Sequence, residues 1–239
     1  MILALLIGLA AGFVGSIAGG GGFISIPGLL LLGISPQGAV ATTKFGALGL
    51  SAGGLWGYRK KVSWNVALVL LVCAVLGALL GTHVLLALPE EILKKAMGAL
   101  LLLVIPFMMQ HESFGVRRQA ASFARKTVGT ILYLPVMAYG AFLGAGGGAA
   151  SRFVLMEFFG MDMIEASATE QAPWLVMTIL SVMIYAGSGI IDYRAGIFVL
   201  AGMLVGSLLG SKLAIRKGAA WAKAFYAMIG IAVGVWLLL

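Results

Sequence analysis

The chain has 239 residues, of which 62% belong to the set AVILMFWYC and only 10% are charged, and its mean hydropathy is +1.09. A water-soluble domain is about 45–50% apolar and about 25% charged, so this composition excludes an ordinary soluble globule. The net charge of +8 comes mostly from basic residues in short polar segments between apolar runs, which indicates a membrane protein rather than a nucleic-acid partner. The apolar runs are continuous, which favours helical spans over a β-barrel.

The first part of the chain is predicted to form five helical pieces. Ser35, followed by Pro36, and Ser63 are suited to positions just before a helix. The second piece, with 11 residues, is too short to cross a hydrocarbon layer of about 30 Å at about 1.5 Å per residue. The five pieces span residues 2–18, 23–33, 36–58, 64–87 and 91–109.

The second part of the chain repeats the first. A shift of 127 residues lays AGGGGF, at 18–23, on AGGGAA, at 145–150, and a shift of 129 lays GALLGT, at 77–82, on GSLLGS, at 206–211. Asp162 and Asp192 stand at the helix starts that match Ser35 and Ser63. We therefore expect two repeats, 1–109 and 127–239, joined by a basic cytoplasmic linker, 110–126. The second repeat is predicted to have helical pieces at 127–144, 149–160, 163–186, 193–214 and 220–238.

Loop charge favours an inverted arrangement of the repeats. If each half crosses the membrane an odd number of times, 11 loop basic residues share one side and three lie opposite, whereas an even number gives 8 and 6. Because basic loops stay in the cytoplasm, both termini are expected on the outer side. The fold class is thus an all-α polytopic membrane protein of two inverted repeats, each with a Gly-rich broken or re-entrant helix pair and three long transmembrane helices. The larger basic group is Arg59, Lys60, Lys61, Arg117, Arg118, Arg125, Lys126, Lys212, Arg216, Lys217 and Lys223, and the smaller is Lys94, Lys95 and Arg194.

Runs of glycine precede the short second piece of each half, at 19–22 and 146–148. Such a run can unwind the chain, and non-helical backbone at membrane depth is tolerated only around a protein-lined or water-filled cavity. The helix that follows offers unpaired N–H groups to an anion. Interrupted segments at matching places in two halves are typical of a transport site. The alternative interpretation is that the glycines only permit close helix packing.

Two basic residues, Lys44 and Arg152, fall inside the predicted spans, where charges are costly and usually functional. The planar fork of Arg152 suits two oxygens of a carboxylate or sulfonate. Alternatives are that Arg152 reaches a lipid headgroup or pairs with Glu157 or Glu170, and that Lys44 pairs with Glu170. Lys44 matches Gln171 in the repeat, so the halves are not chemically equal.

Glu170 is the candidate proton-coupling residue, because a carboxyl in a dry site can bind and release a proton. Threonines on the same segments offer hydroxyl donors, although they can equally bond their own backbone. The candidate substrate-binding residues are Gly20, Gly21, Gly22, Phe23, Thr42, Thr43, Lys44, Gly147, Gly148, Arg152, Thr169 and Gln171.

Patterns for metal, cofactor or enzyme chemistry do not occur in the sequence. Cys73 is the one cysteine, and His83 and His111 belong to no metal-ligand spacing. Neither glycine run continues to GK[ST], which argues against ATP-driven transport by this chain. We expect no cofactor and no metal, and, since no nucleophile with a base is apparent, no enzyme.

The pairing of AGGGGFISIPGLLLLG with SPQGAVATTK, followed by AGGGAASRFVLMEFFG with MDMIEASATEQ, resembles the sulfite exporter TauE/SafE family of membrane permeases over nearly the whole chain. The resemblance implies a secondary transporter that moves a sulfur-containing anion, such as sulfite, sulfoacetate or another organosulfonate, across a prokaryotic inner membrane with proton coupling. The second motif departs from the first in Ala149-Ala150 and in Val154, which replaces the Pro27 equivalent, so we expect an asymmetric site. The partners would be the anion and the bilayer, and a homodimer is compatible with the sequence. A passive anion channel of the same architecture is the alternative.

Overall fold

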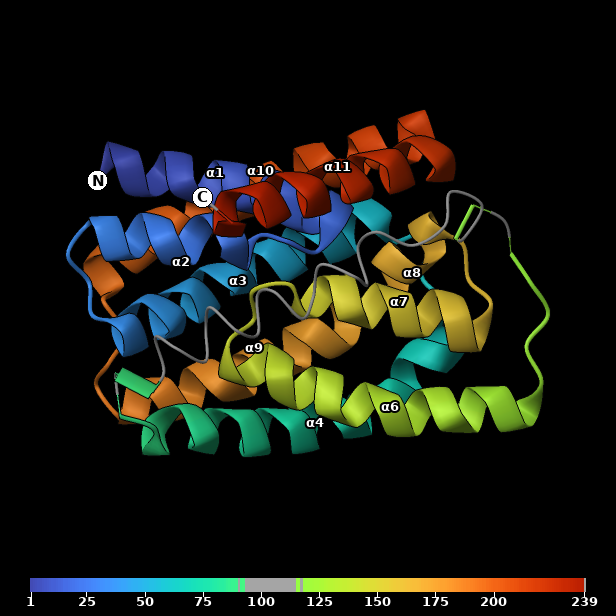
Figure 1. Cartoon of the computed structure of the whole chain (residues 1–239), viewed down its shortest axis with the longest axis horizontal. Helices are drawn as coiled ribbons and strands as arrows, with labels where there is room; N and C mark the ends of the chain where they lie inside the picture. The colour runs from blue at the N-terminus through green and yellow to red at the C-terminus, as the bar shows by residue number, and fades with distance from the viewer. Residues whose placement is uncertain (90, 93–114, 117, 239) are drawn as a thin grey trace.

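The computed structural model describes residues 1–89, 91–92, 115–116 and 118–238, and this part of the chain contains helices and no strand (Figure 1). The predicted piece 91–109 lies outside the described residues apart from its first two. The helices are α1 (Ile2–Ala18), α2 (Gly22–Leu31), α3 (Pro36–Tyr58), α4 (Trp64–Ala87), α6 (Phe123–Phe142), α7 (Gly147–Phe159), α8 (Met163–Thr169), α9 (Gln171–Gly187), α10 (Tyr193–Lys217) and α11 (Ala219–Leu238).

The predicted bounds hold for α1, α3 and α4, and the short pieces α2 and α7 begin one and two residues earlier than expected. The prediction of one helix over 163–186 was wrong in one respect, since the segment is divided at Glu170 into α8 and α9. Pro173 lies at the third position of α9 and has no N–H to donate to the Thr169 carbonyl. The missing bond accounts for the division about one turn before the proline.

Side-chain caps begin several helices where the sequence predicts them. The Ser35 hydroxyl accepts a hydrogen bond from the Gly38 N–H, and the Asp192 carboxylate accepts one from the Ala195 N–H. Asp162 accepts from two N–H groups of the first turn of α8. Ser63 stands at the start of α4 without a side-chain cap bond. These caps satisfy N–H groups that have no partner within their helix.

The first helix of each half packs against the helix that forms the fourth predicted piece of the other half, here called its fourth helix: α1 lies along α10, and α6 along α4. Glycine makes the first contact close, because a Cβ built on Gly12 would lie 2.6 Å from the Met203 Cα. A Cβ on Gly206, from the other side, would lie 2.8 Å from the Phe13 nitrogen. In Figure 1, α1, α10 and α11 form one layer, α4 and α6 the opposite one, and α3, α7 and α9 lie between. The two halves therefore share one core.

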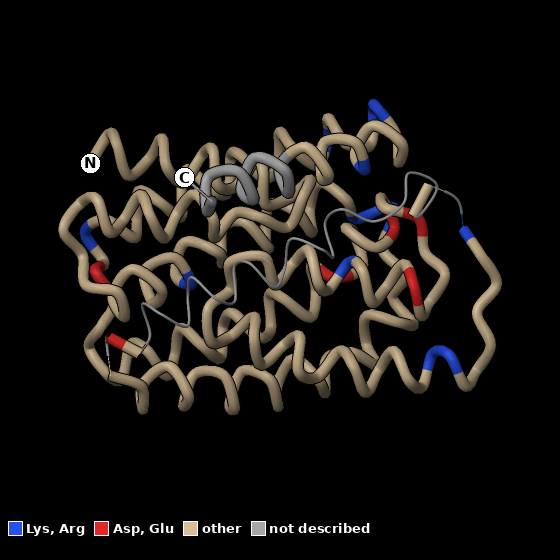
Figure 2. Tube along the Cα trace, viewed as in Figure 1, with Lys and Arg blue, Asp and Glu red and all other residues tan. Residues whose placement is uncertain are grey.

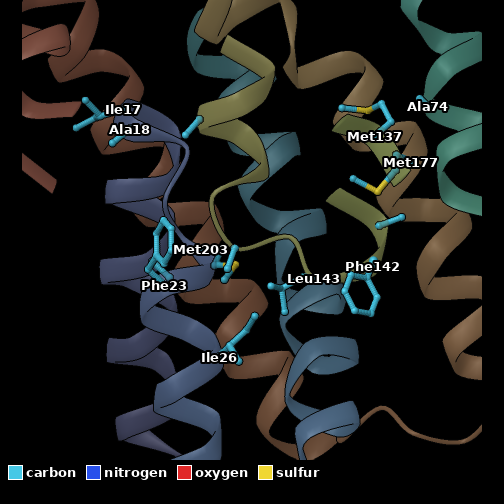
Figure 3. Close-up of a cluster of buried hydrophobic side chains, with 14 of the residues drawn as sticks. Ile17, Ala18, Phe23, Ile26, Ala74, Met137, Phe142, Leu143, Met177 and Met203 are labelled. Atoms are coloured by element: carbon cyan, nitrogen blue, oxygen red, sulfur yellow. The ribbon is translucent and has the colours of Figure 1, made fainter. Parts of the chain in front are cut away.

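Buried apolar side chains from both halves fill the space between these layers (Figure 3). Phe23 and Ile26 of α2 belong to the same cluster as Leu143, which follows α6. Met137 of α6 and Met177 of α9 are fully buried in it. Residues beside the connections from α1 to α2 and from α6 to α7 also belong to the cluster, namely Ala18, Leu143 and Ala145.

Outward-facing side chains of the long helices are apolar. On α4, Leu68 and Val72 are 59% and 64% exposed. Among the described helices, α4 and α10 are long and apolar enough to cross a membrane by length and composition, and α1 and α2 are shorter apolar helices. A face of this kind is unfavourable in water and suited to lipid.

Most Lys and Arg positions gather at one end of the helices, where α3 and α10 end and α6 begins (Figure 2). Lys60, Lys61 and Arg118 line one open groove there with Asp162 and Glu165, and Arg118 pairs with Glu165. The loops that carry the basic residues thus meet at a common end.

Candidate functional site

The segments that hold the two glycine runs contact each other at the backbone. Gly19 ends α1 with a φ of +68°, and Gly146, 127 residues later, precedes α7 with a φ of +75°. A Cβ on Gly148 would lie 2.8 Å from the Gly19 Cα, and one on Gly22 would lie 2.6 Å from the Ala145 Cα. Only glycine permits both this conformation and this approach. The starts of α2 and α7 are therefore brought together.

A cavity of about 60 Å³ adjoins this contact. Four pairs of its lining residues occupy positions 127 apart in the sequence, so matching places in the two halves face the same space. The pairs are Gly21 and Gly148, Thr43 and Glu170, Lys44 and Gln171, and Ala47 and Trp174. The remaining lining residues are Gly15, Gly19, Gly22, Leu50, Ser51, Gly144 and Met203.

Lys44 brings a buried positive charge to the cavity. Its side chain is 2% exposed, and its Nζ donates a hydrogen bond to the Gly140 carbonyl. The same Nζ lies 5.3 Å from the centre of the Trp174 ring, a cation–π contact. Within the described ranges Lys44 forms no ion pair, so the expected alternative of a pair with Glu170 is not found. A buried ammonium group without a carboxylate is costly unless an anion accompanies it.

Several residues that line the same space carry buried polar atoms without partners. Thr43 Oγ1, Gln171 Oε1 and Trp174 Nε1 are buried and form no hydrogen bond with the described protein. Glu170 Oε2 is also unpartnered. All four belong to cavity-lining residues. Because buried polar groups are normally hydrogen-bonded, these atoms mark a place for a polar ligand or water.

Backbone donors add to this set. The N–H groups of Gly21, Gly22 and Gly148 donate to no group in the described part of the chain. Gly21 directly precedes α2, and Gly22 and Gly148 lie in the first turns of α2 and α7, where helix N–H groups have no partner within the helix and the dipole favours negative charge. The cavity thus combines an ammonium group with hydroxyl, indole and backbone donors.

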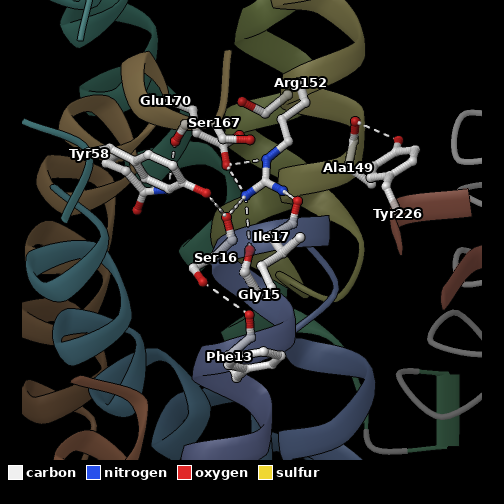
Figure 4. A network of polar contacts seen from close by, with 12 residues as sticks. Phe13, Gly15, Ser16, Ile17, Tyr58, Ala149, Arg152, Ser167, Glu170 and Tyr226 are labelled. Carbon is white, nitrogen blue, oxygen red and sulfur yellow. Dashed lines mark hydrogen bonds and ion pairs between the residues drawn. The ribbon is translucent and has the colours of Figure 1, made fainter. Parts of the chain in front are cut away.

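Arg152 does not line this cavity, which differs from the sequence prediction. Its side chain is fully buried, and it forms an ion pair with Glu170 at 2.8 Å, as one of the alternatives anticipated (Figure 4). The guanidinium also donates to the carbonyls of Gly15, Ser16 and Ile17 in the last turn of α1. A cation at the carboxyl end of a helix is stabilising. Arg152 therefore joins α7 to the end of α1 and holds Glu170.

Thr42 and Thr169 bond across the halves and do not line the cavity. The Thr42 hydroxyl accepts from the Asp192 N–H at 3.0 Å, and the Thr169 hydroxyl accepts from the Ser63 N–H at 3.0 Å. Each contact joins the third piece of one half to the start of the fourth helix of the other. The two contacts lie at opposite ends of the molecule, at the start of α10 and the start of α4 (Figure 1).

The other predicted residues also lie beside the cavity without lining it. Phe23 packs in the apolar core, Gly20 accepts a backbone hydrogen bond from Phe23, and Gly147 contacts the Trp174 ring. The sequence interpretation missed Trp174. Its signal was its spacing, since Trp174 follows Gln171 by three residues and so shares a helical face with it.

Comparison with known proteins assigns the family. The model of the sulfite exporter TauE/SafE family matches residues 4–237. A probable membrane transporter protein of Haemophilus influenzae is 28% identical over 221 residues, covering 91% of this chain and 87% of that protein. The probable membrane transporter protein ORF9 of a Sinorhizobium species is 29% identical over 235 residues, covering 95% and 88%. The probable membrane transporter protein YfcA of Escherichia coli K12 is 25% identical over 219 residues, covering 89% and 80%.

No solved structure matches the chain. The family match covers both glycine runs and every cavity-lining residue. The relatives are named as membrane transporters and not as enzymes, in agreement with the apolar outer faces of the long helices. The chain belongs to the sulfite exporter TauE/SafE family of membrane transporters.

Proposed function

We propose that this chain is a secondary transporter that carries a small sulfur-containing anion, such as sulfite, sulfoacetate or another organosulfonate, across the inner membrane with proton coupling. The observation that carries the proposal is Lys44, a buried basic residue without a carboxylate partner in the described residues, at a cavity whose other lining residues include several with unpartnered polar atoms. An anion would neutralise the ammonium group and accept from the Thr43 hydroxyl and the Trp174 N–H.

The anion would contact Lys44, Thr43 and Gln171 and the N–H groups of Gly21, Gly22 and Gly148. Glu170 is the proposed proton site, because its carboxylate lines the same cavity and keeps one oxygen, Oε2, without a partner. Positioning roles are proposed for the candidates that adjoin the cavity without lining it: Arg152, Thr42, Thr169, Gly20, Phe23 and Gly147.

Alternating access between inverted repeats is the proposed mode of transport. It is supported by the equivalent contacts of the halves, since Thr42 and Thr169 each bond the start of the other half's fourth helix at opposite ends of the molecule. Opening one contact while the other holds would expose the cavity to one side. The basic residues at one end support a cytoplasmic position for that end and an outer position for the termini.

Uptake of radiolabelled sulfite into proteoliposomes, with and without an imposed pH gradient, tests the function. We expect saturable uptake that responds to the gradient and is lost in Lys44→Gln. Lys60→Gln, at the exposed basic end, is the control and should transport normally. Uptake that neither saturates nor responds to the gradient would indicate a passive channel, and no uptake above empty liposomes would refute the proposed substrate class.

A further inference from the structure

The two charged side chains that line the cavity among the described residues, Lys44 and Glu170, have opposite signs and come from opposite halves. Glu170 is 3% exposed, and its Oε1 accepts a hydrogen bond from Arg152 Nε at 2.8 Å. With Lys44 protonated and Glu170 ionised, these two residues and Arg152 together carry one net positive charge. One negative charge in the cavity would make this buried group neutral, whereas two would leave an uncompensated charge away from water.

The unpartnered Oε2 of Glu170 adds a second requirement. An ionised carboxylate oxygen only accepts hydrogen bonds, so an anion oxygen beside it would be repelled unless one of the two carried a proton. A protonated anion could donate to Oε2, or a protonated Glu170 could donate to the anion. Both arrangements contain the same atoms and the same net charge, namely one anion oxygen, one carboxylate oxygen and one proton between them.

We infer that the cavity binds a small oxyanion together with one proton, which the anion shares with Glu170 Oε2. Within the proposed substrate class it therefore favours sulfite, the anion of a weak acid, over an organosulfonate whose only acidic group is a sulfonate. Hydrogensulfite, or sulfite with one proton, meets this requirement. Sulfate and methanesulfonate hold no proton near neutral pH. Either anion could bind in this way only if Glu170 itself took up a proton from water. The proton enters with the anion and leaves with it, so no bond other than the shared O–H is made or broken.

Other titratable groups near Glu170 do not replace that proton. The charged neighbours are Arg152 from α7 and Lys44 from α3, and both are cations that donate rather than accept. Three tyrosines from other helices lie close enough to interact electrostatically with Glu170, namely Tyr58 of α3, Tyr133 of α6 and Tyr226 of α11. Tyr58 donates to the Ser16 carbonyl, and Tyr226 to the Ala149 carbonyl. Tyr133 lies 2.8 Å from the hydroxyl of Ser151, whose side chain also lies close to the Glu170 carboxyl.

This inference rests on the proposed anion site, and calorimetry on the purified full chain separates the two. Sulfite is titrated, at a pH where it is mostly a dianion, in buffers with different ionisation enthalpies, which reports the protons taken up per anion bound. We expect about one proton per sulfite, and sulfite binding roughly tenfold to hundredfold tighter than methanesulfonate or sulfate, the range of a hydrogen bond to a charged group.

Glu170→Gln keeps an oxygen for Arg152 and places an amide donor where Oε2 was. It should bind sulfite as the dianion, without proton uptake, and should bind the sulfate dianion about as well as sulfite. Glu157→Gln is the matched control, because Glu157 pairs with Arg125 away from the cavity, and it should behave as the parent chain. Sulfite binding to the parent chain without proton uptake would overturn the inference and leave the transporter intact. No binding of any anion would overturn both, and this readout needs no variant.

Discussion

Arg152 and Glu170 lie 18 positions apart in the sequence and form a buried ion pair at 2.8 Å, and the Arg152 guanidinium also donates hydrogen bonds to carbonyls at the end of α1. The pair therefore connects three segments, α7, the junction of α8 and α9, and the last turn of α1. Arg152 therefore fixes the position of the Glu170 carboxylate beside the cavity, although Arg152 does not line the cavity itself.

We expect Arg152→Gln to destabilise the protein by about 3–5 kcal/mol, because it leaves Glu170 and the α1 carbonyls without their partner. Thermal unfolding in detergent checks this. Arg125→Gln removes a partly exposed ion pair with Glu157 and should cost about 1 kcal/mol or less. Equal losses in the two variants would show that Arg152 does not carry the structural role assigned to it.

Lys44→Gln should abolish the thermal stabilisation that sulfite gives the parent chain, while stability without the anion stays equal or rises. The reason is that the change removes a buried charge that has no carboxylate partner among the described residues. Unfolding temperatures measured over a range of sulfite concentrations separate the two effects. Retained stabilisation by sulfite would place the anion elsewhere.

Thr42→Val and Thr169→Val should each cost about 1 kcal/mol, because each removes the acceptor of a backbone N–H at the start of α10 or α4. The near-isosteric change leaves packing almost intact. Thr127→Val, which removes only a bond to the exposed first turn of its own helix, is the control and should be near neutral. Unfolding free energies of the three variants give the comparison, and a neutral Thr169→Val would argue against equivalent contacts.

Gly148→Ala should prevent assembly of the cavity, since its Cβ would lie 2.8 Å from the Gly19 Cα with no flexible side chain to yield. Gly187→Ala is the matched control, because a Cβ there meets nothing within 4 Å. Expression level and elution as a single species report the difference. Normal behaviour of Gly148→Ala would mean that the two glycine runs do not need to touch.

Much of the architecture could be predicted because it depends on local signals. Ser35 with Pro36, and Asp162 and Asp192, gave helix starts that the structure confirms. The 127-residue shift located Lys44 and Gln171, which line one cavity. The place of Arg152 could not be predicted, because the direction of its side chain depends on how α7 meets the end of α1. Trp174 was missed because aromatic residues are common in apolar spans and its contact with Lys44 joins distant segments.

The four matched pairs that line the cavity hold unlike residues at the positions that carry charge, Lys44 against Gln171 and Thr43 against Glu170. A dimer of two first halves would bring two ammonium groups into a space of about 60 Å³, and a dimer of two second halves would bring two carboxylates there. Neither half contains the site. Because the two halves are joined in one chain, the sequence of each half can differ from that of the other. Residues of opposite charge, one from each half, can therefore line the same cavity.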